Sequence, residues 1–176
     1  MELAQHDRAR PNEDPLRQEV QMAEPAGPCP PAPSPVATGP VLGSWPVTYA
    51  ADLPELRRSA VAAVGSEQRR VGTEVRDDEL LLLVLCELAT NALRHGSGPA
   101  TVTLSSHGPG WLLDVRDRDG RATPAHRPRD DGRDGGHGLR ILDRATTEWG
   151  WYPEPGRGAK HVWALVPAGG TTEDHR

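Results

Sequence analysis

The sequence predicts an α+β fold: a two-layer sandwich in which helices cover one face of a mostly antiparallel mixed sheet. Three segments carry the hydrophobic repeat or the start and stop signals of helices, and five have the residue pattern of strands. Their order is strand, helix, helix, two strands, long loop, helix, two strands, which favours helices on one side of an antiparallel sheet. A chain of 176 residues is long enough for one such domain with a hydrophobic core.

Proline is concentrated at the start of the chain, where ten of the 18 prolines occur at or before Pro46. A segment of this composition buries too little apolar surface to offset the entropy lost on ordering, so residues 1–43 are predicted to be a disordered tail. A single folded domain is predicted over residues 44–167. Residues 168–176 are predicted to be a disordered C-terminal tail.

Charge and cysteine content restrict the class of function. The net charge of the chain is −5, and residues 44–167 hold 16 basic and 17 acidic side chains, a net charge of −1. Because no basic stripe with interleaved aromatic residues is present, we expect no direct nucleic-acid partner. Cys29 and Cys86 predict reduced thiols rather than a disulfide framework. No signal peptide is visible and the longest apolar run, residues 80–86, is short, so we expect a cytoplasmic protein without a membrane partner.

The first strand is predicted over residues 45–51, at a sheet edge because Pro46 has no amide hydrogen to donate. Asp52 is a typical helix N-cap and is followed by proline and glutamate in the first turn. The helix that begins there is predicted to end at residues 68–71. Its inner side is predicted to comprise Leu53, Leu56, Ala60, Val61 and Val64.

The second helix, LLLLVLCELATNALRHG at residues 80–96, is the segment around which the domain is organised. Glu87, Asn91 and His95 recur every four residues, so these three polar side chains share one stripe of the helix. At 100° per residue the stripe lies at the border of the apolar face. Because unpaired polar groups are costly to bury, we expect the stripe to border a cleft.

A hairpin is predicted next, with strands over residues 100–107 and 111–117 joined by Gly-Pro-Gly. Residues 119–136 are polar and rich in glycine and proline, which predicts a loop. Structureless loops of this length are uncommon in compact domains and are often lids or binding loops. The remaining elements are a short helix and a second hairpin, predicted over residues 138–145, 146–152 and 159–166.

The polar stripe of the second helix is the first candidate site. One amide oxygen from Asn91, together with nucleotide phosphates, is a sufficient ligand set for Mg²⁺, which keeps several of its waters. Glu87, one turn away, is placed to accept a proton from an attacking hydroxyl. The alternative is a surface hydrogen-bond pair between these two side chains, which their spacing also favours.

Two further candidates lie in the second half of the chain. Asp117 ends a strand, where its carboxylate can accept a hydrogen bond from an exocyclic amine such as that of adenine; alternatively, residues 117–120 are an ordinary turn. The last candidate opens the short helix and comprises Gly136, His137, Gly138 and Leu139. Glycines at a helix start free backbone N–H groups to approach an anion. The histidines show no zinc-ligand spacing, and no serine lies in a nucleophile elbow.

Four motifs, ELATNALRHG, VRDRDG, GGHGLRIL and GRGAKHVWALV, together resemble the ATP-binding domain shared by gyrase B, the Bergerat-type heat-shock chaperone, histidine kinases and the mismatch-repair ATPase. The resemblance covers about residues 45–167 and implies a histidine-kinase-like ATPase fold. Within this superfamily the chain is similar to the stand-alone anti-sigma-factor serine/threonine kinases, because nothing before Trp45 can supply the histidine-bearing dimerisation helices of sensor kinases.

The resemblance implies a role for each candidate residue and two cofactors, ATP and Mg²⁺. It implies that Glu87 is the general base, that Asn91 is the magnesium ligand and that Asp117 contacts adenine. It also implies a lid at about residues 121–135. The other cofactor-binding positions it implies are His95, Gly136, His137, Gly138 and Leu139.

Two functions follow from the resemblance. The first is an ATP-dependent kinase and anti-sigma factor that binds a sigma factor, phosphorylates an anti-anti-sigma antagonist and is compatible with a homodimer. The second is a non-catalytic module of the same fold that senses ATP or acts by sequestration alone. An intact Glu87 favours the kinase. Asp119 and Arg121, which stand where the family usually has glycine, favour the non-catalytic module.

Overall fold

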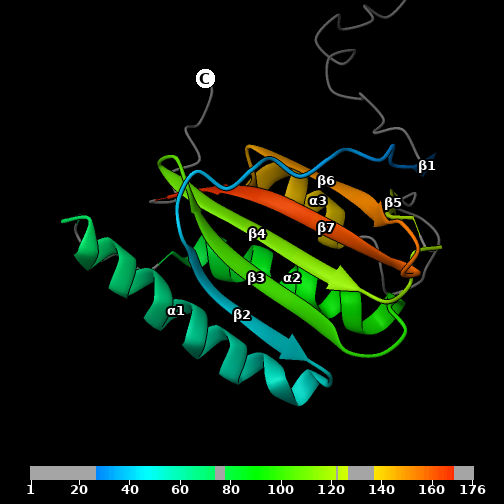
Figure 1. Cartoon of the computed structure of the whole chain (residues 1–176), viewed down its shortest axis with the longest axis horizontal. Helices are drawn as coiled ribbons and strands as arrows, with labels where there is room; N and C mark the ends of the chain where they lie inside the picture. Colours follow the sequence, from blue (N-terminus) through cyan, green and yellow to red (C-terminus); the bar gives the residue numbers. More distant parts are fainter. Residues whose placement is uncertain (1–26, 74–77, 122, 127–136, 169–176) are drawn as a thin grey trace, which may run out of the picture.

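The computed structural model describes residues 27–73, 78–121, 123–126 and 137–168. Within these residues the chain forms a two-layer α+β sandwich of a five-stranded antiparallel sheet and three helices (Figure 1). The helices are α1, Leu53–Arg70; α2, Glu79–His95; and α3, His137–Ala145. The strands of the sheet are β2, Val41–Val47; β3, Ala100–His107; β4, Gly110–Asp117; β6, Glu148–Glu154; and β7, Ala159–Pro167. A short 3₁₀ turn, Ala50–Asp52, precedes α1.

The sheet has the strand order β2-β3-β4-β7-β6, and β2 lies at an edge, as Pro46 predicts. All four strand pairs are antiparallel, so the expectation of a mixed sheet is wrong. The last strand, β7, lies between β4 and β6 rather than at an edge. Its alternate residues Ala164 and Val166 are buried in the hydrophobic core.

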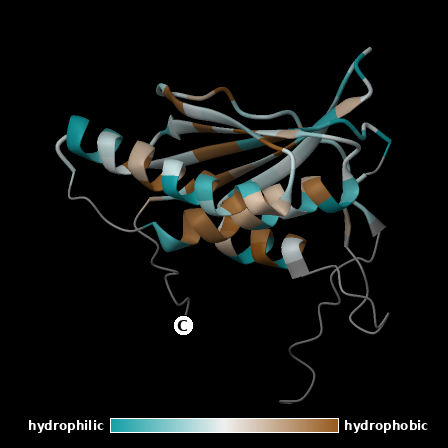
Figure 2. Cartoon of the chain, turned by 90° about the horizontal axis from the view of Figure 1, so that it is seen from below, coloured by the Kyte–Doolittle hydropathy of each residue, from teal (hydrophilic) through white to brown (hydrophobic). Residues whose placement is uncertain are grey.

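The hydrophobic core lies between the sheet and the helices, which Figure 2 shows together on one side of the sheet. α2 contributes most of the helical part of the core, because its buried side is almost entirely aliphatic. Each fully buried leucine stabilises the fold by about 1.5–3 kcal/mol. The buried residues of α2 are Leu81, Val84, Leu85, Leu88, Ala89 and Ala92. In α1, Leu56, Ala60 and Val64 are buried as predicted, whereas Val61 is 46% exposed and does not face the sheet.

The described part of the chain begins at residue 27, before the domain start predicted at residue 44. Of the tail predicted over residues 1–43, residues 27–43 are described, whereas residues 1–26 lie outside the described residues. The first strand also begins and ends earlier than expected, at Val41 and Val47. In Figure 1 the segment of residues 29–40 crosses the sheet on the face opposite the helices.

This proline-rich segment is held by donors that the sheet supplies. The indole N–H of Trp151 donates to the Cys29 carbonyl oxygen at 2.8 Å, and the indole N–H of Trp163 donates to the Ala32 carbonyl oxygen at 3.0 Å. Further along, the Gly39 amide donates to the Ser106 carbonyl oxygen at 3.0 Å. Proline removes amide donors but leaves every carbonyl acceptor in place, so a chain of this composition can dock wherever side-chain donors face it.

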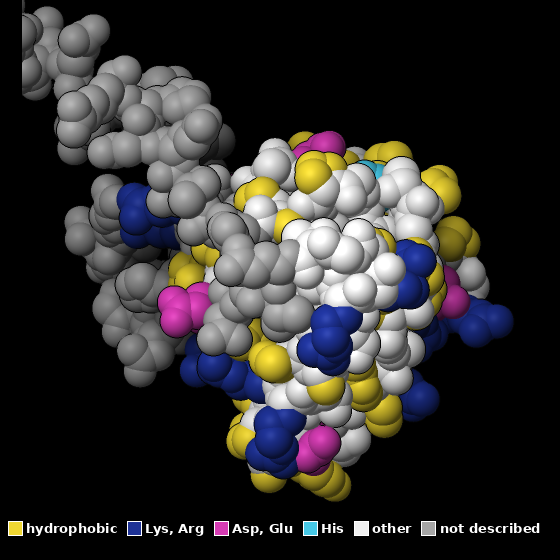
Figure 3. All heavy atoms as spheres, turned by 90° about the vertical axis from the view of Figure 1, so that its left-hand side faces the viewer, with side chains coloured by type: hydrophobic (Ala, Val, Ile, Leu, Met, Phe, Trp, Pro, Cys, Tyr) yellow, Lys and Arg dark blue, Asp and Glu magenta, His cyan; other side chains and the backbone are white. Residues whose placement is uncertain are grey.

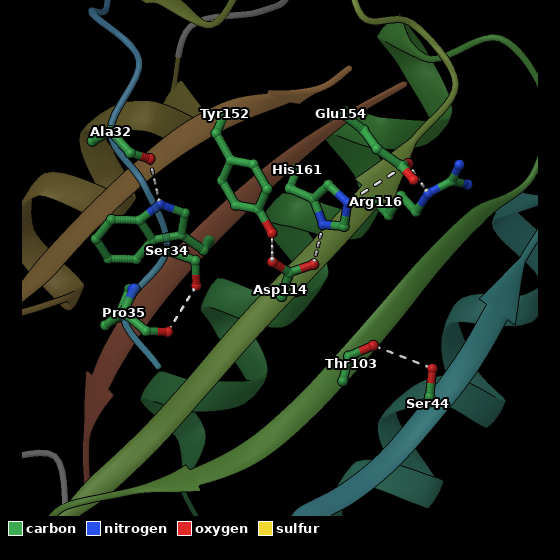
Figure 4. A network of polar contacts seen from close by, with 11 residues as sticks. Ala32, Ser34, Pro35, Ser44, Thr103, Asp114, Arg116, Tyr152, Glu154 and His161 are labelled. Atoms are coloured by element: carbon green, nitrogen blue, oxygen red, sulfur yellow. Dashed lines mark hydrogen bonds and ion pairs between the residues drawn. The ribbon is translucent and has the colours of Figure 1, made fainter. Parts of the chain in front are cut away.

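The same face of the sheet carries a polar network (Figure 4). The Tyr152 hydroxyl donates to Asp114 Oδ2 at 3.2 Å, and His161 Nδ1 lies 2.7 Å from Asp114 Oδ1, with the tyrosine and histidine rings stacked at 4.7 Å. Beside them, Arg116 Nε donates to Glu154 Oε2 at 2.6 Å. Burial, followed by the nearby Asp114 carboxylate, raises the pKa of Tyr152 to about 12.

Charged side chains are dispersed over the face of the molecule drawn in Figure 3. On the side of the molecule shown in Figure 3, arginine side chains stand apart from one another, with hydrophobic and uncharged atoms between them. In the described part of the chain, no helix has the length and apolar character needed to cross a membrane.

Candidate nucleotide site

The candidate site begins where the start of α3 meets the middle of α2. A Cβ atom added to Gly138 would lie 2.7 Å from Asn91 Nδ2 and 3.1 Å from Glu87 Oε2, so only glycine fits there without a shift. Both polar side chains of α2 are half-buried at the border of its apolar face, as the sequence predicts. Within the described residues, no hydrogen bond joins Glu87 to Asn91, so the surface pair considered as an alternative does not form.

A cavity of about 200 Å³ opens from this point toward the end of β4. Its size is below the ~300–1,000 Å³ typical of pockets for drug-sized ligands, so it can take one ring system and leave the rest of a larger ligand outside. Its wall is mixed, with aliphatic side chains on both sides and polar groups at its ends. The lining residues are Leu88, Asn91, Ala92, His95, Val115, Asp117, Thr123, Pro124, Ala125, Gly138, Leu139, Lys160 and Val162.

The cavity lining includes a buried ion pair between Asp117 and Lys160. Asp117 is 2% exposed and Lys160 is 4% exposed. Lys160 Nζ donates to Asp117 Oδ1 at 2.9 Å and lies 2.8 Å from Oδ2. It also donates to the carbonyl oxygen of Asp119 at 2.8 Å, so the ammonium ties the carboxylate to the turn that follows it.

The turn after Asp117 packs directly on the start of β7. The Gly120 amide donates to the Gly158 carbonyl oxygen at 3.0 Å, and a Cβ on Gly120 would lie 3.0 Å from the Ala159 carbonyl oxygen. The turn also contains the local bond expected of an aspartate turn, in which the Asp119 amide donates to Asp117 Oδ1 at 2.8 Å. Neither Asp119 nor Arg121, which stand where the resemblance implies glycine, is among the cavity-lining residues.

The structure brings most of the predicted site residues together. Five of the eight line the same cavity: Asn91, His95, Asp117, Gly138 and Leu139. Glu87 does not line the cavity but lies against Gly138 next to it. Gly136 lies outside the described residues. His137 is the first residue of α3, and its side chain lies outside the described part of the structure.

The expected lid at residues 121–135 is described only in part. Thr123, Pro124 and Ala125 are described and form one wall of the cavity. A short strand, β5 (Ala125–His126), pairs there with β1 (Gly27–Pro28), and the Cys29 amide donates to the Pro124 carbonyl oxygen at 2.9 Å. The N-terminal segment therefore supports the cavity wall, which sequence reasoning missed. Residues 122 and 127–136 lie outside the described residues.

Asn91 is the residue that the resemblance implies as a magnesium ligand. Its carboxamide oxygen is half-buried beside Gly138, and no hydrogen bond to it is recorded within the described residues. A metal held by several protein carboxylates, thiolates or imidazoles is a different kind of site. In the described part of the chain, no group of three histidine, cysteine or acidic residues has that arrangement.

Lys160 is the site residue that the sequence reasoning did not identify. It lies within the motif GRGAKHVWALV, which contributes to the resemblance, but no role was assigned to it. One signal was available, because Lys160 is the only lysine in the chain and the other 19 basic residues are arginine.

Neither a family model nor a curated protein sequence matches the chain.

Proposed function

We propose that the chain binds magnesium-ATP in this cavity and is a serine/threonine protein kinase that acts as an anti-sigma factor. The observation that carries the proposal is the contact of Gly138 with both Glu87 and Asn91 beside a cavity that ends at Asp117. Glu87 and Asn91 lie one turn apart on α2, and Asp117 comes from the end of β4. Each has the chemistry that one part of a nucleotide requires: a base, a metal ligand and an acceptor for an amine.

The proposed roles follow from position. The ring of the base enters the cavity between Val115, Val162 and Leu139, and its exocyclic amine donates to Asp117. Asn91 holds the magnesium ion, which neutralises charge on the phosphates. Glu87, next to this point, accepts the proton of the attacking serine or threonine hydroxyl as the γ-phosphoryl group moves to its oxygen and ADP leaves.

The proposed partners are a sigma factor and an anti-anti-sigma antagonist, the second of which is the phosphoryl acceptor. The protein acts in the cytoplasm in this proposal. The cavity supports the proposed nucleotide site. The two partner proteins are proposed because the four motifs resemble those of anti-sigma-factor kinases.

The test is phosphoryl transfer from labelled magnesium-ATP to a panel of candidate antagonist proteins, with magnesium chelation as a control. We expect label on a serine or threonine of one antagonist, and none after chelation. The kinase proposal fails if ATP binds but no antagonist is labelled under conditions in which the antagonist binds the protein.

A second function is favoured by one specific observation. The Asp117 carboxylate is already ion-paired with Lys160, which leaves it fewer acceptor positions for a ligand. A module that has lost tight nucleotide binding would act by sequestering its sigma factor without ATP. Sigma-factor binding that is equally strong with and without magnesium-ATP, together with no detectable ATP affinity, would support this second function.

A further inference from the structure

Lys160 is the single lysine of a chain with 20 basic residues, and it is buried at the end of the candidate cavity. The side chains of lysine and arginine differ in shape. An arginine fork donates two parallel hydrogen bonds and occupies both oxygens of a carboxylate, whereas an ammonium group is a compact point charge. At a position beside a buried carboxylate, lysine therefore leaves open an acceptor position that arginine would close.

The hydrogen bonds at Asp117 show which acceptor position is open. Oδ1 accepts two hydrogen bonds, from the Asp119 amide at 2.8 Å and from Lys160 Nζ at 2.9 Å. Oδ2 has only the ionic contact with Nζ, at 2.8 Å, among the described residues. A carboxylate oxygen has two lone-pair positions, so Oδ2 keeps capacity for one further donor.

The ammonium group also fixes the direction of this acceptor. Nζ donates to the Asp119 carbonyl oxygen, so lysine joins the carboxylate to the backbone of the turn at residues 117–120. The turn is anchored a second time by the bond from the Gly120 amide to Gly158. With two anchors on the same strand start, the Asp117 side chain has little freedom to rotate away from the cavity.

We propose that Lys160 is a positioning residue that sets base selectivity, by holding Asp117 so that Oδ2 accepts a hydrogen bond from an amino group on the ligand ring. The proposal rests on the proposed nucleotide function and deepens it. The ligand class it specifies is a purine with an amino group at C6. A purine ring with hydrogen at C6 has no donor for the second lone-pair position of Asp117 Oδ2. Such a ring is bound more weakly because that acceptor position stays without a hydrogen bond.

The experiment compares two ligands on the full chain by calorimetry with magnesium present: ATP and purine riboside triphosphate, which has hydrogen in place of the C6 amino group. We expect the wild type to bind ATP about 10- to 100-fold more tightly, the range that one hydrogen bond to a charged group supports. In Lys160→Met the affinity for ATP should fall to about that for purine riboside triphosphate, because a buried carboxylate without its cation is neutralised or turns away.

Lys160→Arg provides a second variant that keeps the positive charge and does not leave Asp117 without a cation. We expect it to fold and to lose the preference for ATP, because the guanidinium occupies both carboxylate oxygens. The matched control is Arg157→Met, which removes an exposed basic side chain on the neighbouring turn and should keep the full preference.

The outcomes separate this inference from the function on which it rests. Equal losses for both ligands, with an unchanged preference for ATP in Lys160→Met and Lys160→Arg, would show that Lys160 only supports the fold. A wild type that binds both ligands equally would overturn the selectivity role and leave nucleotide binding standing. A wild type that binds neither would overturn the proposed function and this inference together.

Discussion

Gly138 lies against the polar side chains of α2, and its missing side chain leaves room for Asn91 and Glu87. We predict that Gly138→Ala lowers magnesium-ATP affinity about 10-fold or more, since the new methyl group would lie 2.7 Å from Asn91 Nδ2 and must displace the metal ligand. Calorimetry measures the affinity. Ser97→Ala, at an exposed position after α2, is the control that should bind as the wild type does.

Substitution of Glu87 distinguishes an effect on phosphoryl transfer from an effect on ATP binding. The proposed base acts only in the transition state, so we predict that Glu87→Gln lowers the rate of phosphoryl transfer by about 10²–10⁴-fold and leaves ATP affinity largely unchanged. Transfer rate and affinity should be measured on the same sample. Transfer at the wild-type rate would remove Glu87 from the role of base, and a collapse of affinity would assign it to metal or helix organisation instead.

Tyr152 gives the fold a dependence on alkaline pH. Its pKa is raised to about 12 in the folded state from 10.0, so its neutral form contributes stability that is complete below pH 10 and is lost as the pH rises through 12. We predict that Tyr152→Phe removes one tyrosinate transition near pH 12 from an ultraviolet absorbance titration. A transition for Tyr152 near pH 10 would contradict the hydrogen bond to Asp114 shown in Figure 4.

At the scale of elements, the N-terminal segment acts as a structural part of the domain. Removing residues 1–40 takes away the carbonyl oxygens that accept the indole N–H groups of Trp151 and Trp163 and uncovers buried aromatic surface. We predict that this truncation lowers the melting temperature by about 5–10 °C relative to a chain starting at Gly27. Equal melting temperatures for the two chains would show that the segment contributes nothing to stability.

The sequence predicted the elements well where their signals are local. The hairpin of β3 and β4 is predicted nearly residue for residue, because Gly-Pro-Gly separates two segments of alternating residues. In the structure Gly108 adopts a positive φ of 53° in the tight turn between the two strands. The start of β2 was missed, since Val41 to Ser44 carry no such signal and pair with β3 only through long-range contacts. The docking of residues 29–40 was missed because composition does not reveal donors on a distant strand.

At the scale of the whole molecule, the site could be predicted only in part. The four-residue spacing of Glu87 and Asn91 can be read from the sequence, and it predicts a polar stripe at the border of the core. The central place of β7 depends on pairing between residues far apart in the chain, and so does the ion pair between Asp117 and Lys160. Only the folded chain shows that the motifs GRGAKHVWALV and VRDRDG line the same cavity.

The central claim is that the cavity between α2, α3 and the end of β4 binds magnesium-ATP through Asn91. Isothermal titration calorimetry of wild type and Asn91→Ala with magnesium-ATP tests it most directly. We predict saturable binding by the wild type and none detectable in Asn91→Ala, because the metal ligand is lost while the helix gains a residue of high helical propensity. Equal affinities in the two proteins, or no binding by the wild type, would contradict the account.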